Sequence, residues 1–110
     1  MDERLEREAN LLHAHVCQAL ADPKRILILY ALSEKPRYVS ELADFLSIPQ
    51  PTVSRHLKVL RERSLVTTER DGAAVYYSLQ DRRVVEALDL LRAVLADELA
   101  QQAQLAQAIS

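Results

Sequence analysis

The sequence predicts a mainly α-helical protein that carries one small β-hairpin. Apolar residues recur at helical spacing over most of the 110 residues. The exception is residues 65–79, where two runs rich in β-branched and aromatic residues flank an Asp-Gly pair, a strong hairpin signal. With one Gly, four Pro and 27% charged residues, the composition is that of an ordered chain. The length predicts a single domain over residues 1–110.

The first helix is predicted at about residues 3–20. Five apolar residues recur there at helical spacing, namely Leu5, Leu12, Val16, Ala19 and Leu20. Asp22-Pro23 marks the start of a second helix, because the carboxylate can accept from free backbone N–H groups and proline's missing donor costs nothing in a first turn. The following ILILYAL is apolar on all sides and could alone be a buried strand, but the Asp-Pro start and the polar stop SEKPR favour a buried helix.

A helix, a very short turn and a second helix are predicted at about residues 40–63. Ser40 is the expected N-cap of the first, in which Leu42, Phe45 and Leu46 form one apolar stripe. The tripeptide SIP at residues 47–49 interrupts the stripe, and a new helical pattern follows it. The arrangement is that of a helix-turn-helix.

The helix predicted from Gln50 to Arg63 separates an apolar face from a polar one. Val53, Leu57 and Leu60 cluster on one side at 100° per residue. Its leading end carries free backbone N–H groups and the positive end of the helix dipole, which favour phosphate, and a helix of this width fits a DNA major groove. The alternative is an ordinary amphipathic helix with a solvated basic face. The candidate DNA contacts on this helix are Gln50, Thr52, Ser54, Arg55 and Lys58.

Positive charge is concentrated in this part of the chain. The formal net charge is −2, yet residues 49–79 hold five basic side chains and only three acidic ones. This distribution is expected of a protein that offers one segment to a polyanion while the remainder keeps it soluble.

The hairpin at about residues 65–79 follows the helix pair directly, which is the layout of a winged helix-turn-helix. Its tip, Arg70-Asp71-Gly72, is placed to reach a flanking minor groove or phosphate. Arg70 is therefore a candidate DNA contact. The alternative is a solvated turn residue, and the neighbouring Asp71 weakens the local positive field.

The last helix is predicted at about residues 81–107. Its apolar stripe consists of Val84, Leu88, Leu91, Leu95 and Leu99. The other helices need their own apolar faces for the core, so this stripe and part of the first helix are expected to form a dimer interface. The alternative is a helix folded back on its own domain. The candidate interface residues are Leu12, Val16, Leu88, Leu91, Leu95 and Leu99.

Three segments resemble the ArsR/SmtB family of winged-helix repressors: ALADPKRILILYAL, VSELADFLSIPQPTVSRHLKVLRERSLV and ERDGAAVYYSL. The resemblance covers roughly residues 10–95, and QPTVSRHLKVL is its most specific string. It implies a homodimer joined by its first and last helices, which binds an imperfect inverted repeat in a double-stranded DNA operator and is released by an effector. The DNA contacts it implies are Gln50, Thr52, Ser54 and Arg55, with Arg70 on the wing.

Some positions depart from the family pattern. Pro49 stands where the family often has a capping Ser or Thr, Ser64 stands where it commonly has Gly, and Ala73 replaces a residue that is often basic. Together these departures predict weaker phosphate contact. His56 belongs to the family's S-x-H-L string, but its direction is oblique to the outer face, so we expect it to give support or a secondary contact.

Two metal sites known in the family are not expected in this chain. The family's C-x-C pair would fall in the segment Glu41–Phe45, which has no cysteine. Of the family's zinc site, Asp81 remains, but Arg83, Val94 and Asp97 stand at the other places, and Arg and Val do not bind zinc.

His13 and Cys17 are the remaining candidates for metal or thiol chemistry. They share a helical face at i, i+4, a spacing that can chelate. The alternative is that Cys17 is a small buried hydrophobe. We predict no cofactor and leave the effector unidentified. A single cysteine also excludes an intrachain disulfide.

The sequence contains no phosphate-binding Gly loop, nucleophile motif or metal triad, so we predict no enzyme activity. The longest apolar run, Ile26 to Leu32, is far shorter than the roughly 20 residues of a membrane span. We expect no membrane partner and a cytoplasmic location. The predicted function is sequence-specific, DNA-binding repression. The alternative, suggested by the negative net charge, is a winged-helix protein-interaction module without specific DNA binding.

Overall fold

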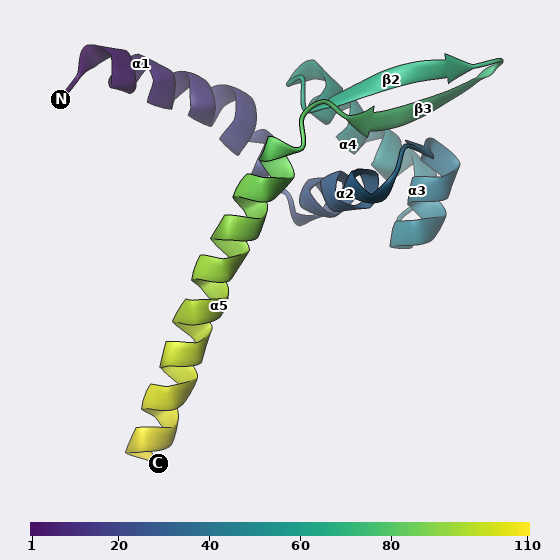
Figure 1. The fold of residues 1–110 in the computed structure, drawn as a ribbon. Helices are drawn as coiled ribbons and strands as arrows, with labels where there is room; N and C mark the ends of the chain where they lie inside the picture. The colour runs from purple at the N-terminus through teal and green to yellow at the C-terminus, as the bar shows by residue number, and fades with distance from the viewer.

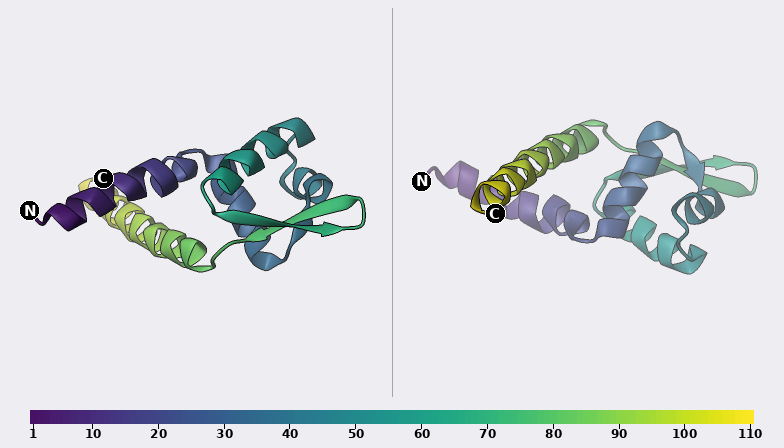
Figure 2. Two further views of the ribbon diagram at one scale, coloured as in Figure 1. Left: turned by 90° about the horizontal axis from the view of Figure 1, so that it is seen from above. Right: turned by 90° about the horizontal axis from the view of Figure 1, so that it is seen from below.

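The computed structural model describes residues 1–110 as a helical body with a β-hairpin and two projecting helices (Figure 1). In the views from above and below, α1 and α5 extend from one end of the body and the hairpin from the other (Figure 2). The elements in order are α1 (Glu3–Leu12), η1 (His13–Cys17), η2 (Ala19–Ala21), α2 (Pro23–Glu34), β1 (Arg37–Tyr38), α3 (Val39–Leu46), α4 (Gln50–Glu62), β2 (Val66–Asp71), β3 (Ala74–Leu79) and α5 (Arg83–Ile109).

The N-terminal arm, which we define as residues 3–21, is not the single helix that the apolar spacing predicts. It begins as expected, with the Asp2 carboxylate accepting from the Arg4 backbone N–H at 2.9 Å. After α1, however, the arm continues as the π-helix η1 and then as the 3₁₀ turn η2. In the π-helical turn the Gln18 N–H donates to His13 O, five residues back, at 3.1 Å. After this change of helical type, Ala19 is buried in the core.

The second predicted helix is confirmed as α2. Asp22 caps it, since its carboxylate accepts from the Lys24 N–H at 2.8 Å, and Pro23 occupies the first turn. The helical interpretation of ILILYAL is therefore correct and the strand interpretation is wrong. The residues of this run that α2 buries are Ile28, Leu29, Ala31 and Leu32.

The prediction that Ser40 caps the third helix is wrong. Helix α3 begins one residue earlier, at Val39, with Tyr38 in the cap position. The Tyr38 backbone N–H donates to the Glu41 carboxylate at 3.0 Å, which closes the first turn without a serine. Tyr38 also pairs with β3 as part of β1, a strand that the sequence did not predict.

Helix α4 follows α3 after a turn in which Ser47 adopts a left-handed conformation, with φ of 55°. Its predicted inner residues Val53, Leu57 and Leu60 are all fully buried. They belong to a single core cluster that also contains residues of α2, α3, β2 and α5. Burial of this face fixes which side of α4 is left for solvent or a ligand.

The predicted hairpin is confirmed and forms part of a three-stranded antiparallel sheet with the order β1-β3-β2. Val66 pairs with Leu79 at its base and Asp71 with Ala74 at its tip. The two turn residues are therefore Gly72 and Ala73, one position beyond the predicted Asp-Gly pair. Gly72 has φ of +63°, which glycine adopts without strain. The helix pair and this hairpin make the fold a winged helix-turn-helix, as predicted.

Helix α5 begins two residues later than predicted, because Asp81 precedes it and accepts from the Arg83 N–H at 2.8 Å. Val85 and Leu88 are its only buried residues. Tyr30 of α2 donates its hydroxyl to the Asp89 carboxylate at 2.6 Å, which attaches the first turns of α5 to the body. The rest of α5 projects away from the helical body (Figure 1). None of the α-helices combines the length and apolar character needed to cross a lipid bilayer.

Candidate nucleic-acid interface

The outer face of α4 gathers all five predicted contact residues of this helix. The buried residues Val53, Leu57 and Leu60 hold the opposite face against the core, so the polar side chains stand outward. Four of these side chains are exposed and Thr52 is partly exposed. The exposed face defined in this way consists of Gln50, Thr52, Ser54, Arg55 and Lys58.

Arg55 and Lys58 are the two cations of this face, and neither is neutralised by a carboxylate within the chain. The only hydrogen bond of the Arg55 side chain runs from Nη2 to Thr52 Oγ1, at 3.3 Å. This contact lies within one helical turn and leaves most of the guanidinium donors free. Both cations are therefore available to an anionic or hydrogen-bond-accepting ligand.

The N-terminus of α4 offers fewer free backbone donors than the sequence suggested. Pro49 occupies the cap position without a side-chain acceptor, as predicted from its departure from the family pattern. The N–H groups of Thr52 and Val53 both donate to Pro49 O, at 3.0 and 3.1 Å, and Pro51 has no N–H. The polar groups that this end presents to solvent are therefore mainly side chains rather than backbone N–H groups.

His56 faces the interior rather than the outer face. Arg25 of α2 donates from Nη1 to His56 Nδ1 at 3.3 Å, and His56 Nε2 lies 4.0 Å from Asp22 Oδ2. Burial lowers the pKa of the His56 imidazole, and the Asp22 carboxylate opposes this shift. The structure therefore places His56 as a support between α4 and the start of α2.

The wing, which we define as β2, β3 and their turn, carries Arg70 near its tip. Arg70 is exposed, pairs with Val75 across the hairpin and forms no ion pair. Because successive side chains of a strand point to opposite faces, Arg70 lies on one face of the wing while Glu69 and Asp71 lie on the other. The two acidic neighbours are thus separated from the cation.

Two tyrosines hold these acidic residues. Tyr38 donates its hydroxyl to Asp71 Oδ2 at 2.9 Å, and Tyr76 donates to Glu69 Oε2 at 2.7 Å. Their rings meet edge to face, with centroids 5.9 Å apart. Each hydrogen bond to a carboxylate raises the pKa of the donating hydroxyl. Sequence reasoning missed both tyrosines; only the pairing of Tyr76 with Glu69 follows from the hairpin register.

A shallow groove of about 370 Å³ joins the wing to the start of α4. Gln50 forms one side of it and Ala74 and Val75 of β3 form another. The start of α4 and strand β3 of the wing therefore border a common surface depression.

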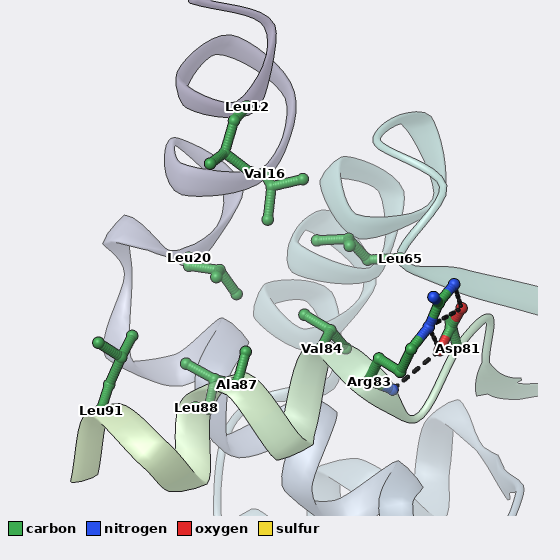
Figure 3. Close-up of a pocket in the computed structure, with 10 residues that line it drawn as sticks. All are labelled: Leu12, Val16, Leu20, Leu65, Asp81, Arg83, Val84, Ala87, Leu88 and Leu91. Atoms are coloured by element: carbon green, nitrogen blue, oxygen red, sulfur yellow. Dashed lines mark hydrogen bonds and ion pairs between the residues drawn. The ribbon is translucent and has the colours of Figure 1, made fainter. Parts of the chain in front are cut away.

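A second, more apolar groove lies where the N-terminal arm meets α5 (Figure 3). It has a volume of about 480 Å³, and Leu12, Val16, Leu88 and Leu91 of the predicted dimer interface all line it. Leu88 is largely buried in the core of its own chain, with 7% of its surface exposed. Leu95 and Leu99 lie further along α5 and are 57% and 55% exposed.

An ion pair lies at the edge of this apolar groove. Arg83 Nη2 is 2.7 Å from Asp81 Oδ2, and the hydrogen bonds from Arg83 lower the pKa of Asp81 to about 2. Both residues that the resemblance places in the family's zinc site at this end of α5, Asp81 and Arg83, are thus engaged with each other.

The candidate metal or thiol residues lie on η1. Cys17 is exposed in the single chain, on the arm that is predicted to form part of the dimer interface. His13 is exposed as well. No group of three or more His, Cys, Asp or Glu side chains lies close enough together to hold a metal ion.

Comparison with known proteins places this geometry in a family. The model of the bacterial regulatory proteins of the arsR family matches residues 22–68, which run from the cap of α2 through α4 into the wing. The HTH-type transcriptional repressor SmtB of Mycobacterium tuberculosis is 49% identical over 67 residues, which cover 61% of this chain and 50% of the relative. The chain thus matches about half the length of that relative.

Two further matches cover more of the known protein. The HTH-type transcriptional regulator NmtR of Mycobacterium tuberculosis is 40% identical over 85 residues, which cover 77% of this chain and 71% of the relative. The solution structure of a homodimeric winged helix-turn-helix DNA-binding domain from Mycobacterium bovis superimposes with a TM-score of 0.75 at 27% identity, over 90% of this chain and 91% of that one.

The family and these relatives are transcriptional regulators rather than enzymes. The order of helices and wing, the exposed polar face of α4 and the extent of these matches lead to one conclusion. The chain belongs to the arsR family of bacterial regulatory proteins.

Proposed function

We propose that the chain is a homodimeric transcriptional repressor that binds an inverted-repeat operator through the N-terminal half of α4. The observation that carries this proposal is the division of α4 into a fully buried apolar face and an exposed face with two unpaired cations. A helix held in this way presents its polar side chains to a groove without exposing core residues.

The contacts on α4 divide into base readers and phosphate binders. Arg55 can place its fork on a guanine, and Gln50 can bond an adenine. Ser54 and Thr52 can bond base edges or meet a thymine methyl group. Lys58 lies one turn further along the helix and suits a phosphate as a point charge.

The wing adds a contact outside the major groove. Arg70 is exposed and free of an ion pair, while its acidic neighbours point to the other face. Arginine is favoured in narrow minor grooves because of their negative potential. We therefore assign Arg70 to the minor groove or phosphates that flank the α4 site.

The dimer of the proposal is formed by the N-terminal arm and α5. These elements expose apolar side chains that their own chain leaves uncovered, and contiguous patches of this kind mark interfaces. A two-fold dimer also places two copies of α4 for two half-sites. Of the predicted interface residues, Leu12, Leu91, Leu95 and Leu99 are exposed, Val16 is partly exposed and Leu88 is buried at the base of the stripe. Other exposed apolar residues of these elements include Leu5, Leu11, Leu90 and Val94.

The test is selection of duplexes from a random library by the full chain, followed by fluorescence anisotropy with the selected duplex. We expect two inverted half-sites with centres about 10 bp apart. We also expect affinity to fall steeply between roughly 50 and 200 mM salt. Failure to select any sequence at low salt would contradict the proposal and favour the protein-interaction alternative. Action on an operator fits the expected cytoplasmic location.

Release by an effector completes the proposal. Affinity for the selected duplex is measured with zinc, arsenite, sulfide and an oxidant, for the unsubstituted chain and for Cys17→Ser. A response lost in Cys17→Ser would assign sensing to the exposed thiol. Identical responses in both proteins would exclude the thiol from sensing.

A further inference from the structure

The N-terminal arm is joined to the body by two arginines that donate to its backbone. Arg63, at the C-terminal end of α4, donates from Nη1 to Ala14 O at 2.8 Å. Arg25, in the first turn of α2, donates from Nε to Ala19 O at 2.6 Å and from Nη2 to Gln18 O at 3.2 Å. Three carbonyls of one short segment thus accept from two guanidinium groups.

The π-helical turn makes one of these carbonyls available. In an α-helix the Gln18 N–H would donate to Ala14 O, four residues back. Here it donates to His13 O instead, so Ala14 O lacks this donor and accepts from Arg63. The other two carbonyls, of Gln18 and Ala19, lie near the C-terminal end of the arm, where the helix dipole favours a cation. Gln18 O also accepts from the Ala21 N–H at 3.3 Å, so the hydrogen bond from Arg25 is its second.

The same arginines reach two points of α4. Arg63 is the C-cap residue of α4 itself. Arg25 uses its remaining terminal nitrogen, Nη1, to donate to His56 Nδ1 at 3.3 Å, and His56 is the immediate neighbour of Arg55. The middle and the end of α4 are therefore both linked to the carbonyls of the arm.

We propose that Arg25 and Arg63 are positioning residues that fix the orientation of α4 relative to the N-terminal arm and so set the half-site spacing that the protein accepts. This inference rests on the proposed function, in which the arm belongs to the dimer interface and α4 enters DNA. The distance between the two copies of α4 then depends on how rigidly each body is held on its arm. A guanidinium serves several acceptors in a fixed plane, whereas an ammonium is a point charge on a flexible stem.

The test replaces each arginine by lysine, which keeps the positive charge and removes the planar guanidinium group with its several N–H donors. The variants are Arg25→Lys and Arg63→Lys, and the control is Arg61→Lys, an exposed arginine of α4 that forms no hydrogen bond or ion pair. The probes are the duplex selected by the unsubstituted chain and two derivatives with one base pair added or removed between the half-sites. Anisotropy gives the affinity of each protein for each duplex.

We expect the unsubstituted chain and Arg61→Lys to discriminate strongly against both altered spacings. In Arg25→Lys and Arg63→Lys, affinity for the selected duplex should fall by about tenfold, the effect of losing a charge-assisted hydrogen bond. Affinity for the duplexes with altered spacing should fall less. The ratio of the affinity for the selected duplex to the affinity for each altered duplex should therefore decrease. A purely structural role would weaken binding to all duplexes equally.

An unchanged ratio, with or without a uniform loss of affinity, would overturn the inference. Thermal unfolding of each variant shows whether it folds, and because the two arginines lie on different helices, either variant carries the test if the other fails to fold. Failure of the unsubstituted chain to select a duplex would overturn the proposed function instead, so the two failures are distinguishable.

Discussion

At the scale of single residues, Arg55 is the side chain on which base reading depends most in the proposal. It is exposed, its one internal contact is the weak bond to Thr52, and no carboxylate competes for it. Its neighbour His56 faces inward and is held by Arg25. Of these adjacent residues of α4, Arg55 is therefore available to a ligand, whereas His56 contacts the body.

Arg55→Ala is expected to cost about 1 to 3 kcal/mol in binding to the selected duplex and little in binding to a random duplex. The reason is that a fork on a base edge carries sequence information, whereas phosphate contacts do not. Anisotropy with both duplexes measures the effect, with Arg61→Ala as the control on the same helix. An equal loss on both duplexes would show that Arg55 contacts only the backbone.

Tyr38→Phe is expected to weaken DNA binding by about threefold, because it removes the hydroxyl that donates to the Asp71 carboxylate at the wing tip and fixes its position. The freed carboxylate adds negative charge near the DNA phosphates. Tyr77→Phe is the matched control, since its hydroxyl forms no hydrogen bond with the protein. The measurement is the affinity of each variant for the selected duplex at several salt concentrations. Equal affinities for Tyr38→Phe and the unsubstituted chain would contradict the expectation.

The α4 face could be predicted from the sequence because the helical period alone determines it. Once Val53, Leu57 and Leu60 are inward, Ser54, Arg55 and Lys58 must be elsewhere. The contact between Tyr38 and Asp71 could not be predicted, because it depends on β1, a two-residue strand whose pairing partner lies far along the chain.

At the scale of elements, the end of α4 carries a conformational strain. Ser64 adopts φ of 60°, and the Leu65 N–H closes the helix end by donating to Leu60 O at 2.9 Å. A residue with a Cβ is disfavoured in this left-handed conformation, where glycine is common. The departure of Ser64 from the family pattern, noted from the sequence, thus has a structural counterpart.

Ser64→Gly is expected to increase the free energy of unfolding by about 1 kcal/mol, because glycine adopts the left-handed conformation without the Cβ clash. Ser40→Gly is the control, because Ser40 lies in the first turn of α3, where glycine is expected to lower stability by up to about 1 kcal/mol. Urea denaturation of both variants measures the two changes. A destabilised Ser64→Gly protein would contradict the argument.

The start of α5 gives a pH-dependent contribution to stability. Hydrogen bonds from Arg83 lower the pKa of Asp81 from 3.8 to about 2. A carboxyl whose pKa is depressed on folding contributes stability that is present above its unfolded value and is lost as the pH falls through the folded value. The contribution of Asp81 should therefore disappear between about pH 4 and pH 2.

The measurement is thermal unfolding across this pH range. Asp81→Asn should be less stable than the unsubstituted chain at neutral pH, and the difference should shrink as the pH approaches 2. Asp97→Asn, which changes an exposed carboxylate of the same helix with no hydrogen-bond partner, is the control. A difference independent of pH would show that the ion pair does not contribute.

The elements themselves were predictable to different degrees. The start of α2 follows from Asp22 and Pro23, whose effects are local. The change to a π-helix at His13 does not follow from the local sequence, because the apolar spacing of the arm fits a regular helix. The change accompanies hydrogen bonds from Arg25 and Arg63, which lie in the body.

At the scale of the whole molecule, the chain is a body with two uncovered projections. Only Val85 and Leu88 of α5 are buried, and none of the residues of α1 is. The body has a continuous core, whereas the leucines of α1 and those of α5 beyond Leu88 are exposed. This asymmetry could be predicted from the unpartnered stripe of the last helix, but the directions of the two projections could not, because no local pattern encodes them.

Leu95→Glu is expected to weaken dimerisation by on the order of 100-fold or more, since a carboxylate would be buried without a partner in the proposed interface. Ala93→Glu is the control, because it lies on the opposite side of α5 at 100° per residue. Sedimentation velocity over a range of protein concentrations measures association. A dimer of Leu95→Glu as stable as that of Ala93→Glu would place the interface elsewhere.

The projecting part of α5 has a consequence for the life of a newly made chain. Beyond its first turns this helix has no hydrophobic surface of its own chain to lie against, and most helical stability in proteins comes from such burial. In a monomer this segment is therefore kept helical only by its intrinsic helix propensity, and it is open to fraying and proteolysis. In the proposed dimer, the C-terminal part of α5 is stabilised only when two chains associate. The resistance of the protein to proteolysis therefore increases with its concentration in the cell.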